Sequence, residues 1–198
     1  MLLHKTIVFL LCPIFRLLYR IKVTGRENMP SGAAVVCCNH TSWIDPVLLS
    51  LGLGPKVQLC YMGKKEVFKN PILNKIFRAV GAFPVDRENV ELATIRHSIE
   101  LLKEGKKLGI FPEGRRVREG EEENAATGAK TGVAMIAMRA NVPIIPVFLT
   151  RRKRILHRHH LIVGKPIIPE KKEGSTSENY QRIAQEAFQA ILDLGDRT

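Results

Sequence analysis

Short apolar runs rich in Val and Ile alternate along this chain with longer segments in which apolar residues recur every three or four positions. The first pattern is typical of buried strands, and the second of helices that bury one face. Their alternation predicts an α/β domain, with a central, mostly parallel or mixed sheet flanked by helices. We expect strands at residues 21–24, 33–38, 57–62, 82–85, 107–111, 144–149 and 161–163.

The clearest helical period lies in residues 90–103, where apolar residues fall three or four positions apart before Gly105 ends the pattern. The chain has no internal repeat and no linker-like stretch, so residues 23–198 are predicted to form one domain. Further helices are expected near Pro46, Pro71, Thr127 and Ser177.

Residues 1–22 form a segment of different character. The uncharged stretch 6–15 is interrupted by Pro13 and closed by Arg16. A membrane-spanning helix needs about 20 apolar residues, and no cleavage site typical of a signal peptide follows. Residues 1–22 are therefore predicted to form an amphipathic helix in the membrane interface, with an ordinary core helix as the alternative. Basic side chains would then meet lipid headgroups: Lys5, Arg16, Arg20 and Lys22.

The charge balance points to anionic partners. The chain has 31 Lys and Arg against 19 Asp and Glu, a formal net charge of +12. Nucleic acid, anionic lipid surfaces and small phosphorylated substrates all fit this excess. The four cysteines show no CxxC pair and no spacing typical of a zinc site. We therefore expect no metal and a reduced protein that faces the cytoplasm.

The segment 38–46, Cys-Asn-His-Thr-Ser-Trp-Ile-Asp-Pro, follows a predicted strand and ends in a proline suited to the first turn of a helix. Residues five apart lie about 140° apart on a helix and on opposite faces of a strand, so only a turn brings His40 and Asp45 together. Asp45 would then orient the imidazole while His40 removes a proton. A structural histidine and a helix-capping Asp45 are the alternatives.

Two other predicted strands also run into arginines. The strand within 107–116 leads to Pro-Glu-Gly-Arg-Arg. Gly114 allows the backbone to approach a ligand, Arg116 offers phosphate a planar fork, and Glu113 would hold an arginine or an acceptor hydroxyl. The short strand before Arg87 makes that residue a second phosphate candidate. Solvated turns with surface ion pairs are the alternative for both segments.

Taken in order, these segments resemble the glycerolipid acyltransferases, and within them the 1-acylglycerol-3-phosphate (lysophosphatidic acid) acyltransferases. Residues 39–46 are similar to the family's His-x4-Asp motif, 81–87 to its second block, 111–116 to its third and 142–147 to its fourth. The resemblance covers most of the chain. Four blocks in the right order are far more specific than any single one.

The resemblance implies a role for each matching residue. His40 would be the general base and Asp45 its partner. The glycerol phosphate of the acceptor would be bound by Arg87, Glu113, Gly114 and Arg116. Further positions similar to the family pattern are Lys64, Lys130 and Gly132.

The implied reaction moves a fatty acyl group from an acyl carrier protein or coenzyme A thioester to the sn-2 hydroxyl of 1-acylglycerol 3-phosphate. The product would be phosphatidic acid, made without a metal or other cofactor by a monotopic or peripheral protein at the cytoplasmic face of the cell membrane. An apolar groove is expected to lead to His40 and to open toward the N-terminal helix. Arg115 departs from the family's usual Thr, which leaves a different lysolipid or polyol acceptor as the alternative.

Three further alternatives come from other residues. The basic runs 151–154 and 157–160 would suit nucleic acid, but they lack interleaved aromatics, so a lipid-headgroup contact or a solvated loop is favoured. His157, His159 and His160 would form a metal site only at the cost of charge repulsion. Cys38 would be the nucleophile of a covalent route, although buried free cysteines usually act as small apolar residues.

Overall fold

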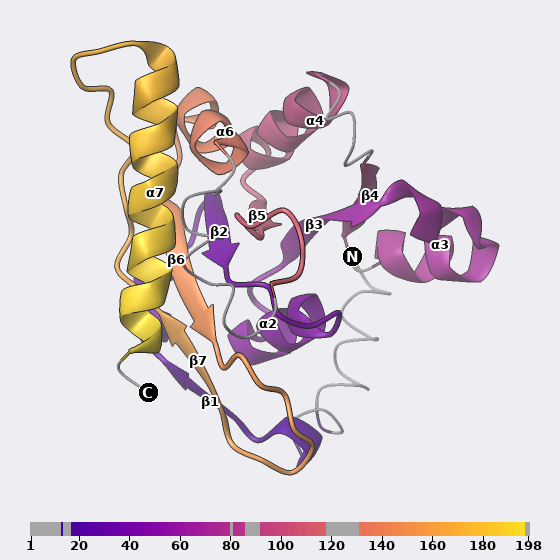
Figure 1. Ribbon diagram of the computed structural model, residues 1–198. Coiled ribbons are helices and arrows are strands. Elements are labelled where there is room, and N and C mark those ends of the chain that lie inside the picture. Colours follow the sequence, from indigo (N-terminus) through magenta and orange to yellow (C-terminus); the bar gives the residue numbers. More distant parts are fainter. Residues whose placement is uncertain (1–12, 14–16, 80, 86–91, 118–130, 197–198) are drawn as a thin grey trace.

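The computed structural model describes residue 13 and residues 17–79, 81–85, 92–117 and 131–196. They form an α/β domain around a seven-stranded sheet with the strand order β1-β7-β6-β2-β5-β3-β4 (Figure 1). The predicted fold class is confirmed. The strands are β1 (Ile21–Thr24), β2 (Ala34–Cys38), β3 (Leu59–Lys64), β4 (Ala82–Val85), β5 (Lys107–Ile110), β6 (Ile144–Leu149) and β7 (His159–Val163).

The sheet is mixed, and its directions decide which loops meet. Strands β6, β2, β5, β3 and β4 are parallel to one another. Strand β7 is antiparallel to β6, and β1 is parallel to β7. The carboxyl ends of the five parallel strands therefore share one edge of the sheet with the start of β1 and of β7. Functional sites of open α/β sheets lie at this edge, which is called the carboxyl edge below.

Helices cover both faces of the sheet because the central strand is apolar on both. All five residues of β2 are buried. Val35 and Cys37 pack in one core with α4, α6 and α7, and Ala34 and Val36 pack in the other core with α2 (Figure 1). The helices are α2 (Asp45–Leu53), α3 (Pro71–Ala79), α4 (Leu92–Lys103), α6 (Gly132–Ala140) and α7 (Thr176–Gly195), with 3-10 turns η1 (Arg26–Asn28) and η2 (Lys65–Lys69).

The strands observed at 21–24, 82–85 and 144–149 have the predicted bounds. Strand β3 lies two residues later than predicted, and β7 starts two residues earlier, because the alternation of apolar and polar residues is weak at these ends. Residues 1–12 and 14–16, which hold most of the predicted interfacial helix, lie outside the described residues. Within the described part of the chain, no helix is both long and apolar enough to cross a membrane.

Candidate active site

The turn after β2 is held in place by Asn39. Its side-chain amide donates to the carbonyl of Leu149 at 2.9 Å and accepts from the Leu149 N–H at 2.8 Å. These two bonds continue the pairing of β2 with β6 beyond the last strand residue. The chain then leaves the sheet and enters α2 at Asp45, with Pro46 in the first turn. Because Asn39 is bonded to β6 in this way, His40, which follows it directly, is fixed at the carboxyl edge.

His40 and Asp45 meet inside this turn. The imidazole Nδ1 of His40 lies 3.0 Å from Oδ2 of Asp45. The same oxygen accepts the backbone N–H groups of Thr41 and Ser42, each at 2.7 Å. Because Asp45 occupies Nδ1, Nε2 is the nitrogen that would accept a proton from a substrate. The predicted pairing of base and orienter is therefore present in the structure.

Asp45 is a buried carboxylate that stays ionised. Its exposed fraction is 0%. Burial disfavours its charge, but hydrogen bonds from His40, Lys153 and the Ser42 backbone, together with the nearby Lys153 charge, hold the pKa of Asp45 below its usual range. A negative charge at this position would stabilise an imidazolium formed at His40.

The turn after β5 packs directly on His40. Glu113 Oε1 accepts the His40 backbone N–H at 3.0 Å, and the Val117 N–H donates to the His40 carbonyl at 2.8 Å. The rings of His40 and Phe111 stack with centroids 4.2 Å apart. Two segments that the sequence separates by about seventy positions are thus one structural unit, with His40 at its centre.

Glu113 differs from Asp45 in its surroundings. Only 9% of it is exposed, and its buried Oε2 has no hydrogen-bond partner among the described residues. Burial raises the pKa of Glu113 to about 7, although hydrogen bonds from its own N–H and from the His40 N–H oppose the change. Glu113 is therefore a carboxyl group whose pKa lies near neutrality and whose Oε2 is unpaired among the residues that the structure describes.

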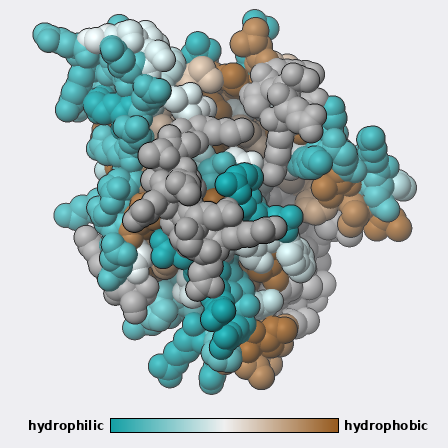
Figure 2. Space-filling view, in the orientation of Figure 1, coloured by the Kyte–Doolittle hydropathy of each residue, from teal (hydrophilic) through white to brown (hydrophobic). Residues whose placement is uncertain are grey.

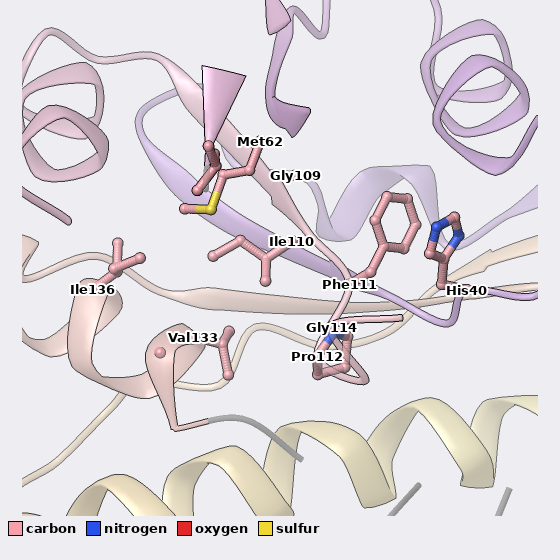
Figure 3. A pocket seen from close by; sticks show the side chains of 11 residues that line it. His40, Met62, Gly109, Ile110, Phe111, Pro112, Gly114, Val133 and Ile136 are labelled. Atoms are coloured by element: carbon pink, nitrogen blue, oxygen red, sulfur yellow. The ribbon is translucent and has the colours of Figure 1, made fainter. Parts of the chain in front are cut away.

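An apolar cavity of about 150 Å³ adjoins His40. Figure 3 shows His40 and Phe111 at one end of it, and Val133 and Ile136 of α6 at the other. Met62, in the second half of β3, lies on the wall between them. A lining of this kind suits a hydrocarbon chain, as the sequence predicted for the approach to His40. The predicted opening toward the N-terminal helix lies outside the described residues.

Gly114 and Arg116, two of the predicted phosphate ligands, lie in the turn after β5. Gly114 has a φ of 67°, a conformation that glycine adopts without strain, and it lines the cavity. The side chains of Arg115 and Arg116 are exposed on the outer side of the turn. Arg115 and Arg116 follow Gly114 directly in the chain but do not line the cavity, so the predicted phosphate-binding role of Arg116 stays a prediction.

The other predicted site positions lie on elements other than the two turns that meet at His40, or they lie outside the described residues. Lys64 ends β3, separated from β2 by β5, and its exposed side chain lies 3.7 Å from Glu66. Gly132, at the start of α6, lines the cavity. Arg87 and Lys130 lie outside the described residues, so their predicted roles stay predictions.

The covalent and metal alternatives gain no support. Cys38 is fully buried, and burial raises the pKa of its thiol well above the usual value, which opposes a reactive thiolate. His159 is buried in β7 with Nε2 2.8 Å from the Arg154 carbonyl, whereas His157 is exposed. Within the described ranges, no group of three or more His, Cys, Asp or Glu side chains is placed to hold a metal ion.

Two residues of the site were missed by sequence reasoning. Asn39 precedes His40, and its position at a strand end next to the candidate base was an available signal. Lys153 carried no such signal because it lies within a basic run. Its ammonium lies 2.6 Å from Asp45 Oδ1, and only 5% of its side chain is exposed.

Comparison with known proteins identifies the class of protein that this fold and site define. A family model described as "Acyltransferase" matches residues 20–150. The chain therefore belongs to the acyltransferase family, as the order of its motifs predicted.

Individual relatives agree with this assignment. A Bacillus subtilis protein named 1-acyl-sn-glycerol-3-phosphate acyltransferase is 37% identical over 153 residues, which cover 74% of this chain and 73% of that protein. A Streptococcus pneumoniae protein of the same name is 38% identical over 117 residues, 59% of this chain and 41% of that protein. The crystal structure of the 1-acyl-sn-glycerophosphate (LPA) acyltransferase PlsC from Thermotoga maritima has the same fold, with a TM-score of 0.69. It is 24% identical, and the match covers 97% of this chain and 78% of that one.

Proposed function

We propose that this protein transfers a fatty acyl group from an acyl thioester to the sn-2 hydroxyl of 1-acylglycerol 3-phosphate, giving phosphatidic acid for phospholipid synthesis. The observation that carries the proposal is the His40–Asp45 pair, 3.0 Å apart, at the end of an apolar cavity of about 150 Å³. A base that faces an apolar cavity suits a reaction between a hydroxyl and an acyl chain. The names of the relatives supply the acceptor.

The reaction requires one proton to move and one bond to exchange. Nε2 of His40 takes the proton of the acceptor hydroxyl while that oxygen attacks the thioester carbonyl. The tetrahedral intermediate collapses, the carbon–sulfur bond breaks, and the imidazolium returns the proton to the thiolate. Asp45 stabilises the imidazolium throughout. The co-substrate is acyl carrier protein or coenzyme A loaded with the acyl chain, and no other cofactor takes part in this scheme.

The turn after β5 supports a phosphorylated acceptor. Gly114 adjoins the cavity, and Arg115 and Arg116 follow it on the exposed side. Guanidinium groups pair with phosphate in a bidentate manner, so an acceptor phosphate held there would place its glycerol near His40. Arg115 stands where the 1-acylglycerol-3-phosphate acyltransferases usually have Thr. The added positive charge favours a second candidate function, which is acyl transfer to another anionic lysolipid.

Purified protein tests these alternatives directly. Acylation is measured with lysophosphatidic acid, lysophosphatidylglycerol and glycerol 3-phosphate as acceptors, each with acyl carrier protein and coenzyme A thioesters. We expect transfer to lysophosphatidic acid with the largest kcat/KM. Faster transfer to a different lysolipid would replace the acceptor, and the lack of any transfer in every combination would overturn the proposal.

We also propose that the carboxyl edge faces a membrane surface. Trp43 in the turn after β2, Ile72 at the start of α3 and Leu156 in the loop between β6 and β7 are all 63–73% exposed. The hydrogen bond from Leu156 N to Leu18 O brings that loop beside the exposed Leu17. Figure 2 shows apolar areas over α3 and at the lower edge of the molecule, near this loop. Exposed apolar side chains next to cations are typical of interfacial binding.

A matched pair of variants tests this membrane-facing edge. Leu156 and Ile168 are each 63% exposed, but Ile168 follows β7 and adjoins the start of β6, at the opposite edge. Leu156→Ser is expected to weaken sedimentation with vesicles that contain phosphatidylglycerol, and Ile168→Ser to leave it unchanged. Equal effects of the two variants would mean that the carboxyl edge is not the membrane side. Deletion of residues 1–20 tests the predicted N-terminal anchor in the same assay.

A further inference from the structure

Asp45 has two carboxylate oxygens, and the pairing with His40 uses only one of them. Oδ2 receives the His40 imidazole and the N–H groups of Thr41 and Ser42. Oδ1 is turned the other way, toward the loop between β6 and β7, where the ammonium of Lys153 lies 2.6 Å from it. The orientation of the carboxylate is therefore decided from both sides.

Lys153 is held in this place by neutral partners as well. Its ammonium donates to Thr41 Oγ1 at 2.6 Å and to the Arg151 carbonyl at 3.3 Å. The Thr41 hydroxyl donates in turn to that same carbonyl at 2.8 Å. Thr41 and Arg151 thus join the two loops around the ammonium, and 5% of the Lys153 side chain remains exposed. A cation buried to this degree is costly unless it is fully paired, which Asp45 achieves here.

We propose that Lys153 is a positioning residue of the acyl transfer reaction, one that fixes the Asp45 carboxylate and balances its negative charge beside the base. The inference rests on the proposed function. We refer to Asp45, Lys153 and His40 as the cluster. With Lys153 present, the charges of the Asp45 carboxylate and the Lys153 ammonium sum to zero, and a neutral imidazole leaves the cluster uncharged. Without Lys153 the cluster carries one net negative charge, which an imidazolium would neutralise. A His40 that already holds a proton cannot accept one from the acceptor.

Other charged groups near the pair do not replace Lys153. Glu113 contacts the His40 backbone, and its ionised form adds negative charge to the cluster. Phe111 covers the imidazole with an apolar ring. Among the described residues, Lys153 is the cation in ion-pair distance of Asp45.

Two substitutions in the same loop separate positioning from general charge. Lys153→Met keeps the length of the side chain and removes the ammonium. Arg154→Met removes the same charge from an exposed neighbour. The main-chain carbonyl of Arg154, which lies 2.8 Å from His159 Nε2, is retained in this variant. Both are assayed with short-chain, monomeric acceptor and donor, so that membrane binding has no influence. We expect Lys153→Met to lower kcat at least tenfold with KM little changed, and Arg154→Met to stay within about twofold of wild type.

The pH profile gives a result that a purely structural lysine would not produce. The acid side of the kcat profile of Lys153→Met is expected to move upward by about one pH unit, because both Asp45 and His40 lose a neighbouring positive charge. Lys153→Arg retains that charge and is expected to return the profile toward that of wild type even if its kcat is reduced by the larger guanidinium. Wild-type kcat and an unshifted profile in Lys153→Met would overturn the proposal.

Two more measurements keep the result interpretable. If Lys153→Met folds poorly, the double variant Asp45→Asn/Lys153→Met removes both buried charges and is expected to be as active as Asp45→Asn alone, since the two residues act as a unit. Additive losses would argue against the inference. NMR titration of the His40 imidazole needs no substrate, so an unchanged midpoint in Lys153→Met overturns the role of Lys153 even if wild type proves to acylate nothing.

Discussion

The turns after β2 and β5 each bring a buried carboxyl group to His40, and the pKa values of these two groups are shifted in opposite directions. Asp45 is completely buried, yet its Oδ2 accepts hydrogen bonds, the ammonium of Lys153 lies 2.6 Å from its Oδ1, and its pKa lies below the usual range. Glu113 is slightly more exposed, but within the described part of the chain its Oε2 has no hydrogen-bond partner, and burial raises its pKa to about 7. Burial is therefore not what separates the two groups. The number of donors that surround each carboxylate decides its charge.

This difference divides the work at the site. In the proposed reaction an ionised Asp45 stabilises the imidazolium of His40, whereas Glu113 Oε2 would meet a substrate hydroxyl or an arginine. The two groups also oppose each other in the pH dependence of folding, because one pKa falls on folding and the other rises. Each of the following variants breaks or sharpens this contrast, in order of decreasing effect.

Removal of the base should have the largest effect. His40→Ala leaves both carboxyl groups in place and is expected to lower kcat about 1,000-fold, since general-base catalysis contributes on this scale. Circular dichroism confirms folding, and steady-state acylation of lysophosphatidic acid gives kcat. Cys38→Ala serves as a control on the same strand end and should retain activity within about twofold. Loss of activity in that control instead would revive a covalent route.

Asp45→Asn removes the ionised partner. We expect kcat to fall about 100-fold or more, because the imidazolium loses its counter-charge. The free energy of unfolding should also fall by about 3 kcal/mol near neutral pH, since the ammonium of Lys153 is left buried without a counter-ion. Kinetics and urea unfolding measure the two effects. An unchanged stability would show that water reaches Lys153 in the folded protein.

Glu113→Gln tests the opposite sign. The folded pKa of Glu113 is about 7 against an unfolded value of 4.5, so folded protein binds the extra proton between these values. Its contribution is fully present below about pH 4.5 and is lost as the pH rises through 7, a change of about 3 kcal/mol. Glu113→Gln should remove this decline. Urea unfolding between pH 5 and 8 compares the two proteins, and parallel curves would contradict the assignment.

The contribution of Asp45 runs the other way. Its lowered pKa means that the stabilisation is present above the unfolded value of 3.8 and is lost as the pH falls through the folded value. The same urea series, extended below pH 4, should therefore show wild type losing stability toward that of Asp45→Asn. The two carboxyl variants thus differ from wild type in separate pH windows.

The smallest effect concerns the cavity rather than the charges. Gly132 lines it, and a Cβ added there meets no atom of the described residues within 4 Å, so Gly132→Leu introduces a larger side chain at the cavity without a clash at Cβ. We expect kcat/KM for long acyl donors to fall roughly tenfold relative to short ones, with both carboxyl groups unaffected. Competition between donors of two chain lengths measures the ratio. An unchanged ratio would place the acyl chain elsewhere.

The sequence by itself determined the elements and the candidate base. The apolar run of β2 and the helical period of α4 are local patterns, and such patterns follow directly from the geometry of strands and helices. The spacing of His40 and Asp45 around a turn is local as well, so their pairing was predicted and is confirmed.

Only the tertiary structure decided how the two carboxyl groups differ. The donors to Asp45 include Lys153, whose partner Thr41 is 112 positions away, and Asn39 bonds to Leu149 at a separation of 110. These contacts exist because β6 lies next to β2, and the strand order depends on how whole helices and strands pack. In the sequence, Asp45 and Glu113 are two carboxylic acids with similar ordinary pKa values. Their charges follow from neighbours that the folded sheet brings together.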